Sequence, residues 1–180
     1  MVIVAAFIFA VIIFLATGRA TASVAAPLKT MPDSQKPSAF KAKFLAESAS
    51  VQWHGIPIRF ALAVADVETG GGTNNLSRKA NNIFSIKVGS GWREGWDGEQ
   101  TYTTADGGVF RSYKSWAESM ADFVHLLHFS RYENALAYAL VGNFPAFAAE
   151  LKKAGYDASN PKYADALVSR YRQYENVEVA

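Results

Sequence analysis

The 180-residue sequence contains no cysteine, and charged side chains make up only 19% of it. The lack of cysteine excludes disulfides, thiolate metal sites and a cysteine nucleophile, but it leaves the cellular compartment open. Lysine and arginine number 18 against 16 acidic residues, and no basic block indicates a nucleic-acid partner. No Gly-x-Ser-x-Gly or phosphate-binding loop occurs. His125 and His128 share a helix face, but no further ligand is apparent, so we expect no metal or other cofactor.

The most hydrophobic run lies at the N-terminus, where residues 1–18 are apolar almost without a break. As a helix rising 1.5 Å per residue, this run would span about 27 Å, just enough for a thin bilayer. We therefore expect residues 1–26 to be a transmembrane anchor or signal segment. An uncleaved anchor is favoured, because no Lys or Arg precedes the run. Residues 27–37 contain three prolines and predict an extended linker before a folded domain at 38–180.

The folded part is predicted to be mainly α with one small β element. Apolar spacing, a Ser115–Glu118 capping box and an Asn160-Pro161 start signal support the helices. They are expected over residues 39–54, 57–69, from 115, 132–140, 144–154 and 160–174. Between them, the stretches Thr101–Thr104 and Val109-Phe110, separated by Asp106-Gly107-Gly108, predict a β-hairpin.

The helix from Phe60 onward ends with an acid, Glu68, directly before three glycines. On this mostly apolar helix, Arg59 and Asp66 form the polar stripe, and Glu68 falls roughly opposite to it. Lost solvation and the negative end of the helix dipole both raise the pKa of a carboxyl placed there. A proton donor at neutral pH needs such a shift, although a structural ion pair would also explain an acid at this position.

A glycosidase of the common kind needs a second acid across the scissile bond. The Gly- and Trp-rich segment supplies four candidates that could also be plain solvated loop acids: Glu94, Asp97, Glu99 and Asp106. Aromatic side chains could stack on sugar rings, although more than half of them are expected to be core residues.

Four ordered blocks of the sequence resemble the glucosaminidase family of peptidoglycan hydrolases, glycoside hydrolase family 73, which includes autolysins and flagellar muramidase domains. The blocks are ADVETGGG at 65–72, NNIFSIK at 81–87, FRSYKSWAES at 110–119, and AGYD through PKYA at 154–164. Together they span roughly residues 40–174. The resemblance implies a lysozyme-like helical fold with a β-hairpin lobe.

The resemblance also implies roles for individual residues. Glu68 matches the catalytic acid and Tyr163 the active-site tyrosine. Asp106 is the acid nearest to the expected second position, where many members have Glu. Ser85 stands where glycine is more usual. Substrate binding is expected from further residues of these blocks: Asn82, Phe84, Lys87, Tyr113, Trp116 and Tyr156.

The predicted function is hydrolysis of the β-1,4 bond after N-acetylglucosamine in peptidoglycan. The catalytic domain is expected outside the cytoplasm, on the periplasmic or cell-wall side of a membrane, or exported, with a phage association left open. A lytic transglycosylase that uses one acid remains an alternative. So does a non-catalytic peptidoglycan-binding part of a larger assembly that crosses the cell wall, such as a secretion, conjugation, flagellar or phage-entry machine.

Overall fold

The computed structural model describes residues 38–89 and 100–176 of the chain. The expected anchor and linker lie outside these residues, and no helix within them is long and apolar enough to cross a membrane. The described part is mainly helical with one two-stranded sheet, as predicted. Its elements are α1 Ala39–Ser48, α2 Ile58–Thr69, α3 Asn75–Lys79, β1 Thr101–Thr103, β2 Val109–Arg111, α4 Trp116–Leu127, η3 Ser130–Tyr132, α5 Glu133–Leu140, α6 Phe144–Lys153 and α7 Tyr163–Tyr171.

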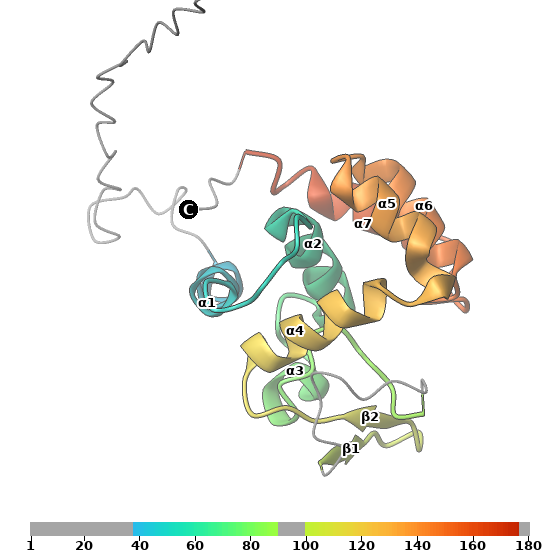
Figure 1. The fold of residues 1–180 in the computed structure, drawn as a ribbon. Helices are drawn as coiled ribbons and strands as arrows, with labels where there is room; N and C mark the ends of the chain where they lie inside the picture. The colour runs from blue at the N-terminus through green and yellow to red at the C-terminus, as the bar shows by residue number, and fades with distance from the viewer. Residues whose placement is uncertain (1–37, 90–99, 177–180) are drawn as a thin grey trace, which may run out of the picture. The chain divides into compact units, whose positions relative to one another are not determined.

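Helix α2 is the buried centre of the described part. Every residue from Phe60 to Asp66 is buried, because α1 and α7 pack against this helix (Figure 1). Helices α5, α6 and α7 pack on one another at one end, and α3 and the hairpin lie at the other (Figure 1). Gly70 ends α2 with a φ of 58°, a left-handed conformation that glycine adopts without steric cost. Gly70 therefore fixes where α2 ends, and the last turn of α2 lies between the group formed by α5, α6 and α7 and the group formed by α3 and the hairpin (Figure 1).

The polar stripe of α2 contacts the C-terminal segment of the described chain. Asp66 is buried; it accepts a hydrogen bond from the Tyr174 hydroxyl and pairs with Arg170 at 3.2 Å. Arg59 donates to the backbone carbonyl of Glu175. Both polar residues therefore fasten the C-terminal segment to α2, and the helix is enclosed on this side as well.

The other helices match the predicted ones, with shifts at their ends. The first was expected to reach His54 but ends at Ser48, whose backbone carbonyl accepts a hydrogen bond from the Trp53 indole instead of continuing the helix. The last begins at Tyr163 and not at Asn160, because the Asn160 side chain accepts from the Lys162 backbone in a turn before the helix. The expected capping bond is confirmed, since Ser115 accepts from the Glu118 backbone N–H at 3.2 Å.

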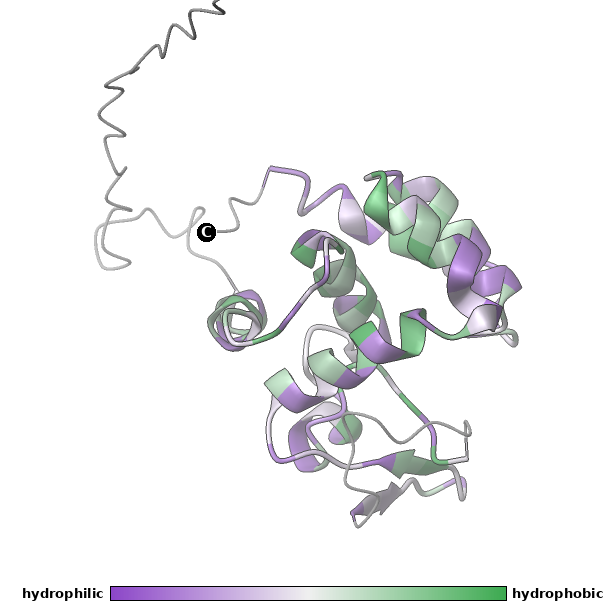
Figure 2. Cartoon of the chain, viewed as in Figure 1, coloured by the Kyte–Doolittle hydropathy of each residue, from purple (hydrophilic) through white to green (hydrophobic). Residues whose placement is uncertain are grey.

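The hairpin is confirmed and is tied to the helical core through a buried ion pair. Strands β1 and β2 are antiparallel, with Tyr102 opposite Phe110. At the end of β2, Arg111 is 1% exposed and donates to both carboxylate oxygens of Asp122 on α4 at 2.8 Å. The Tyr113 hydroxyl donates to the same carboxylate. Apolar and hydrophilic residues alternate along α4, which suits a helix that packs on the core and also carries Asp122, the partner of Arg111 (Figure 2).

We predict that Asp122→Ala lowers the free energy of unfolding by about 3–5 kcal/mol, because it leaves the Arg111 charge buried without its carboxylate. Urea unfolding followed by circular dichroism measures the change. Lys153→Ala is the matched control, since it breaks the Glu150 pair in which the lysine is 71% exposed. Such a pair contributes about 0–1 kcal/mol. Equal effects of the two substitutions would contradict a supporting role for the buried pair.

Candidate active site

Glu68 lies in the last turn of α2, where its side chain is half-buried. The Tyr163 hydroxyl, at the start of α7, donates a hydrogen bond to its Oε1 at 2.6 Å. The Asn74 side chain donates to the backbone carbonyl of Glu68 at 3.0 Å and so secures the end of the helix. Tyr163 and Glu68 are 95 positions apart in the sequence, and the fold brings them together so that the tyrosine holds the carboxyl in place.

Burial raises the pKa of Glu68 above its ordinary value, and the negative charge of Asp157 acts in the same direction. Hydrogen bonds from Tyr163 and Ser85 oppose the shift, because they favour the charged carboxylate, but burial is the larger effect. The predicted upward shift is therefore confirmed, with burial as its main cause. A half-buried carboxyl that holds its proton at higher pH can act as a general acid.

The loop after α3 brings Ser85 beside Glu68 in a strained conformation. Ser85 has a φ of 52°, in the left-handed region that favours glycine. The buried Asn82 side chain shapes this loop: it donates to the carbonyls of Ile86 and Arg111 and accepts from the Ile86 N–H. The non-glycine residue at this position therefore places a hydroxyl where a glycine would have none.

The Tyr156 ring packs beside the ring of Tyr163. The two rings stack with their centroids 6.1 Å apart and an interplanar angle of 16°. The Tyr156 hydroxyl donates to the backbone carbonyl of Phe84. Burial raises the pKa of both phenols, and the nearby Glu68 charge adds to the rise. Both hydroxyls are therefore neutral donors near neutral pH and orient groups without taking part as bases.

Four of the residues expected to bind substrate are buried, so the contacts they make in this structure are supporting ones, and their contact with a sugar stays a prediction. Asn82 and Phe84 are 0% exposed, and Phe84 stacks on Phe123 with centroids 4.1 Å apart. Tyr113 and Trp116 are buried as well, with the Trp116 ring against Phe40. A side chain with little or no exposed surface offers a ligand little contact area, although it fixes the backbone around it. Of the predicted binding set, Tyr156 is half-buried and Lys87 is exposed.

Asp106 lies exposed in the turn of the hairpin between β1 and β2. A hydrogen bond from Thr104 is the main cause that lowers its pKa below the ordinary value, and the charge of Lys87 contributes. Asp106 is thus ionised under conditions in which Glu68 keeps its proton. Its role as the second acid stays a prediction, and the other three candidates, Glu94, Asp97 and Glu99, lie outside the described residues.

The described residues contain no group of three or more His, Cys, Asp or Glu side chains that could hold a metal ion. His125 lies on α4 and His128 directly follows this helix, and the His128 ring lies against the His54 ring with centroids 6.0 Å apart.

A lysozyme-like glycoside hydrolase is the class that this arrangement defines, with a helix-borne acid beside a β-hairpin lobe. A family model described as "Glucosaminidase: Mannosyl-glycoprotein endo-beta-N-acetylglucosaminidase" matches residues 45–176. The chain belongs to this glucosaminidase family.

Curated relatives are similar over most of the chain. The peptidoglycan hydrolase FlgJ of Pseudomonas aeruginosa is 35% identical over 136 residues, which are 69% of this chain and 33% of that protein. The protein of the same name from Vibrio cholerae is 31% identical over 160 residues, which are 83% of this chain and 47% of that protein. The chain thus matches between a third and a half of the length of these relatives.

Solved structures are similar over nearly their whole length. A peptidoglycan hydrolase from Sphingomonas sp. A1 has a TM-score of 0.60 and 31% identity, covering 74% of this chain and 86% of that one. The glycoside hydrolase domain of Salmonella typhimurium FlgJ has a TM-score of 0.57 and 28% identity, covering 75% of this chain and 86% of that one. These similarities confirm the predicted fold class for the catalytic part.

Sequence reasoning identified Glu68 and Tyr163 but missed two neighbours of the acid. Ser85 was noticed only as a departure from glycine, and that departure was the available signal for a hydroxyl near Glu68. Asp157 directly follows Tyr156 in a motif block, yet the pattern did not show that its charge reaches Glu68. Both effects depend on distances across the fold, which spacing along the chain does not encode.

We predict that Ser85→Gly raises the pKa of Glu68, because it removes a hydroxyl that stabilises the carboxylate. Titration of ¹³C-labelled glutamate carboxyls by NMR measures this. Glycine suits the φ of 52°, so the substitution should not lower the melting temperature. Ser85→Ala is the control: it also removes the hydroxyl but keeps the backbone strain. An unchanged Glu68 pKa in both variants would contradict the role assigned to Ser85.

Proposed function

We propose that the chain is a peptidoglycan glycosidase that cleaves the β-1,4 bond after N-acetylglucosamine in cell-wall glycan strands. The observation that carries the proposal is the Glu68 carboxyl, whose pKa burial raises and which the Tyr163 hydroxyl holds in place at 2.6 Å. Membership of the glucosaminidase family and similarity to peptidoglycan hydrolases support the substrate class. A binding protein without catalysis has no need of a carboxyl whose pKa is raised by burial.

In the proposed mechanism Glu68 donates its proton to the glycosidic oxygen as the bond breaks. The Tyr163 hydrogen bond to Oε1 restrains the carboxyl and stabilises the carboxylate left after donation. Asp106, with its lowered pKa, is ionised and suits activation of the water or support of the reacting sugar. The substrate's own acetamido group could act as the nucleophile instead, which would relax the need for a second acid.

We predict that Glu68→Gln lowers peptidoglycan lysis by about 10²–10⁴-fold or more, since the amide has no acidic proton to give. Zymography and turbidity assays on purified cell walls measure the loss. Activity near wild type in a folded variant would remove Glu68 from the mechanism.

Thermal melting of the same variant separates catalysis from folding. Because the folded-state pKa of Glu68 is raised, the native protein binds more protons than the unfolded chain. Its stability therefore falls as pH rises from near 4.5 through the folded-state pKa. The glutamine variant does not lose stability in this way, because its amide does not titrate. At pH 7 it should therefore melt at a temperature equal to or higher than that of the wild type, and this difference should disappear below about pH 4.

Asp106 is predicted to matter more for activity than the other three acids. It combines a turn position in the hairpin with a place just before the motif block that begins at Phe110. Alanine substitution of each acid, assayed on the same peptidoglycan, ranks them. If Asp106→Ala stays active while Glu99→Ala is dead, the second acid is misassigned. If all four variants stay active, the acetamido-assisted route or a transglycosylase with one acid is the better explanation.

Mass spectrometry of the released muropeptides distinguishes the candidate reactions. Hydrolysis after N-acetylglucosamine leaves a reducing N-acetylglucosamine end, whereas a lytic transglycosylase leaves an anhydro sugar. A chain that binds peptidoglycan without releasing either product would be a non-catalytic component of a larger assembly.

The proposed location is the outer side of a membrane, in the periplasm or at the cell wall, with residues 1–18 as the tether and residues 27–37 as the spacer. The length of the apolar run and the three prolines of the spacer support this proposal. Cell fractionation with protease accessibility tests it. Full-length protein found only in the cytosol would contradict both the tether and access to peptidoglycan.

A further inference from the structure

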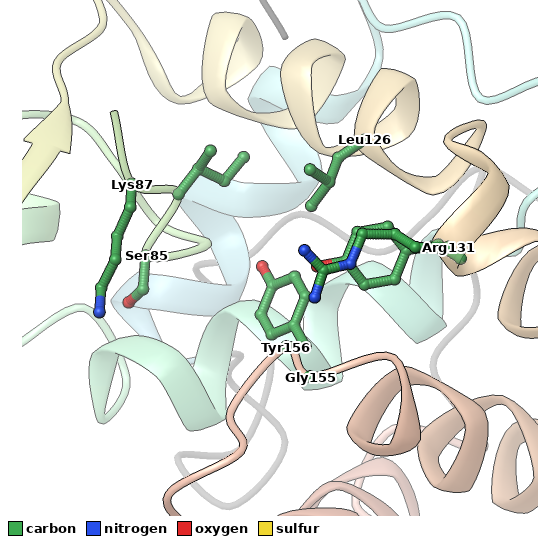
Figure 3. Close-up of a pocket in the computed structure, with 8 residues that line it drawn as sticks. Ser85, Lys87, Leu126, Arg131, Gly155 and Tyr156 are labelled. Atoms are coloured by element: carbon green, nitrogen blue, oxygen red, sulfur yellow. The ribbon is translucent and has the colours of Figure 1, made fainter. Parts of the chain in front are cut away.

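A pocket of about 210 Å³ lies beside the catalytic residues and is not part of the proposed chemistry. Its lining comes from the loop at Ser85, from the end of α4 and its following turn, and from the turn before α7: Ser85, Ile86, Lys87, Leu126, Arg131, Tyr132, Gly155 and Tyr156. Ser85 and Lys87 lie on one side, and Arg131 with Tyr156 on the other (Figure 3). Pockets that enclose a whole drug-sized ligand measure about 300–1,000 Å³, so this one suits a substituent.

Arg131 is held in place at this pocket by backbone and ring contacts. Its Nε donates to the carbonyl of Ala154 at 3.1 Å, and its Nη2 donates to the same oxygen. The guanidinium also lies over the Tyr132 ring, 5.1 Å from its centroid. In Figure 3 the guanidinium points toward the ring of Tyr156. A guanidinium carries five N–H donors, so the Nη1 amine remains available to a ligand.

The charge of the pocket lining is positive. Lys87 and Arg131 are its two cations, and the residues that line it include no carboxylate. Within the described part of the chain neither cation forms an ion pair, and the Lys87 ammonium lies 5.7 Å from the centroid of the Phe110 ring. Tyr132 and Tyr156 are neutral, since burial raises the pKa of both phenols. The lining therefore favours a ligand group that is both small and negatively charged.

We infer that this pocket binds a carboxylate-bearing substituent of the glycan strand, with Arg131 as the main contact and Lys87 at the rim. The inference rests on the proposed function. Ser85 joins the two sites, because it lines the pocket and lies near enough to Glu68 for its hydroxyl to lower the pKa of that carboxyl. We therefore expect a substituent on a sugar bound at Glu68 to enter the pocket that Arg131 lines. Peptidoglycan offers two such groups: the lactyl carboxylate of muramic acid where the peptide is absent, and the carboxylates of the peptide stem where it is present.

The test measures binding to Glu68→Gln protein, which holds substrate without cleaving it. Three probes are titrated calorimetrically at low salt: neutral chitotetraose, a peptide-free tetrasaccharide of alternating N-acetylglucosamine and N-acetylmuramic acid, and the same tetrasaccharide with peptide stems. Arg131→Met and Lys87→Met are each added to this background. Arg172→Met is the matched control, because Arg172 is exposed, follows α7 and does not line the pocket. Thermal melts verify that every variant is folded.

Arg131→Met should weaken binding of a carboxylate-bearing probe by about 5- to 30-fold, as expected for one charge-assisted hydrogen bond in a partly solvated pocket. Lys87→Met should weaken binding of the same probe to a smaller extent. The affinity for chitotetraose should change less than twofold in both variants. A loss confined to the peptide-free probe assigns the lactyl carboxylate, and a loss confined to the peptide-bearing probe assigns the stem.

If Arg131→Met binds all three probes as Arg172→Met does, the inference is wrong while the proposed function stands. If the Glu68→Gln protein binds none of the probes, the proposed function fails and the inference fails with it.

Discussion

The desolvation of one carboxyl, Glu68, is the constraint on which the site depends. A buried helix has to deliver this carboxyl to the edge of the core, and Gly70 has to stop the helix two residues later. The Tyr163 hydroxyl then holds the carboxyl without neutralising the effect of burial. If α2 were solvated at Glu68, the pKa of this carboxyl would return toward its ordinary value, and the environment that suits it to the proposed role of general acid would be lost.

The surrounding polar contacts keep this geometry rigid. Asp66, two residues before the acid, binds Tyr174 and Arg170 and so fastens the C-terminal segment to α2. On the other side, the Arg111–Asp122 pair joins the hairpin to α4. Asp66 and Tyr174 are 108 positions apart in the sequence, whereas Arg111 and Asp122 lie on consecutive elements, 11 positions apart. Together these contacts fasten the C-terminal segment and the hairpin to the helices, while the acid itself remains half-buried.

The two acids assigned to the mechanism have opposite environments. Glu68 is half-buried, and burial raises its pKa, whereas Asp106 is exposed on a turn, where Thr104 and Lys87 lower its pKa. Opposed shifts of this kind separate an acid from a base at one pH. The cationic pocket next to Ser85 contains neither acid, and the role inferred for it is recognition of a carboxylate on the substrate, separate from proton transfer.

The sequence by itself determined the helical class, the hairpin and the acid at the end of a buried helix, because apolar periodicity, turn residues and capping signals are local. Its motif blocks also determined the family. Only the tertiary structure decided which motif residues are exposed and which are buried. Asn82, Phe84, Tyr113 and Trp116 support the site from within the core, whereas Arg131, which belongs to no motif, lines a pocket beside it. Burial and the pKa shifts that follow from it are set by residues distant in the chain, and no local pattern encodes those distances.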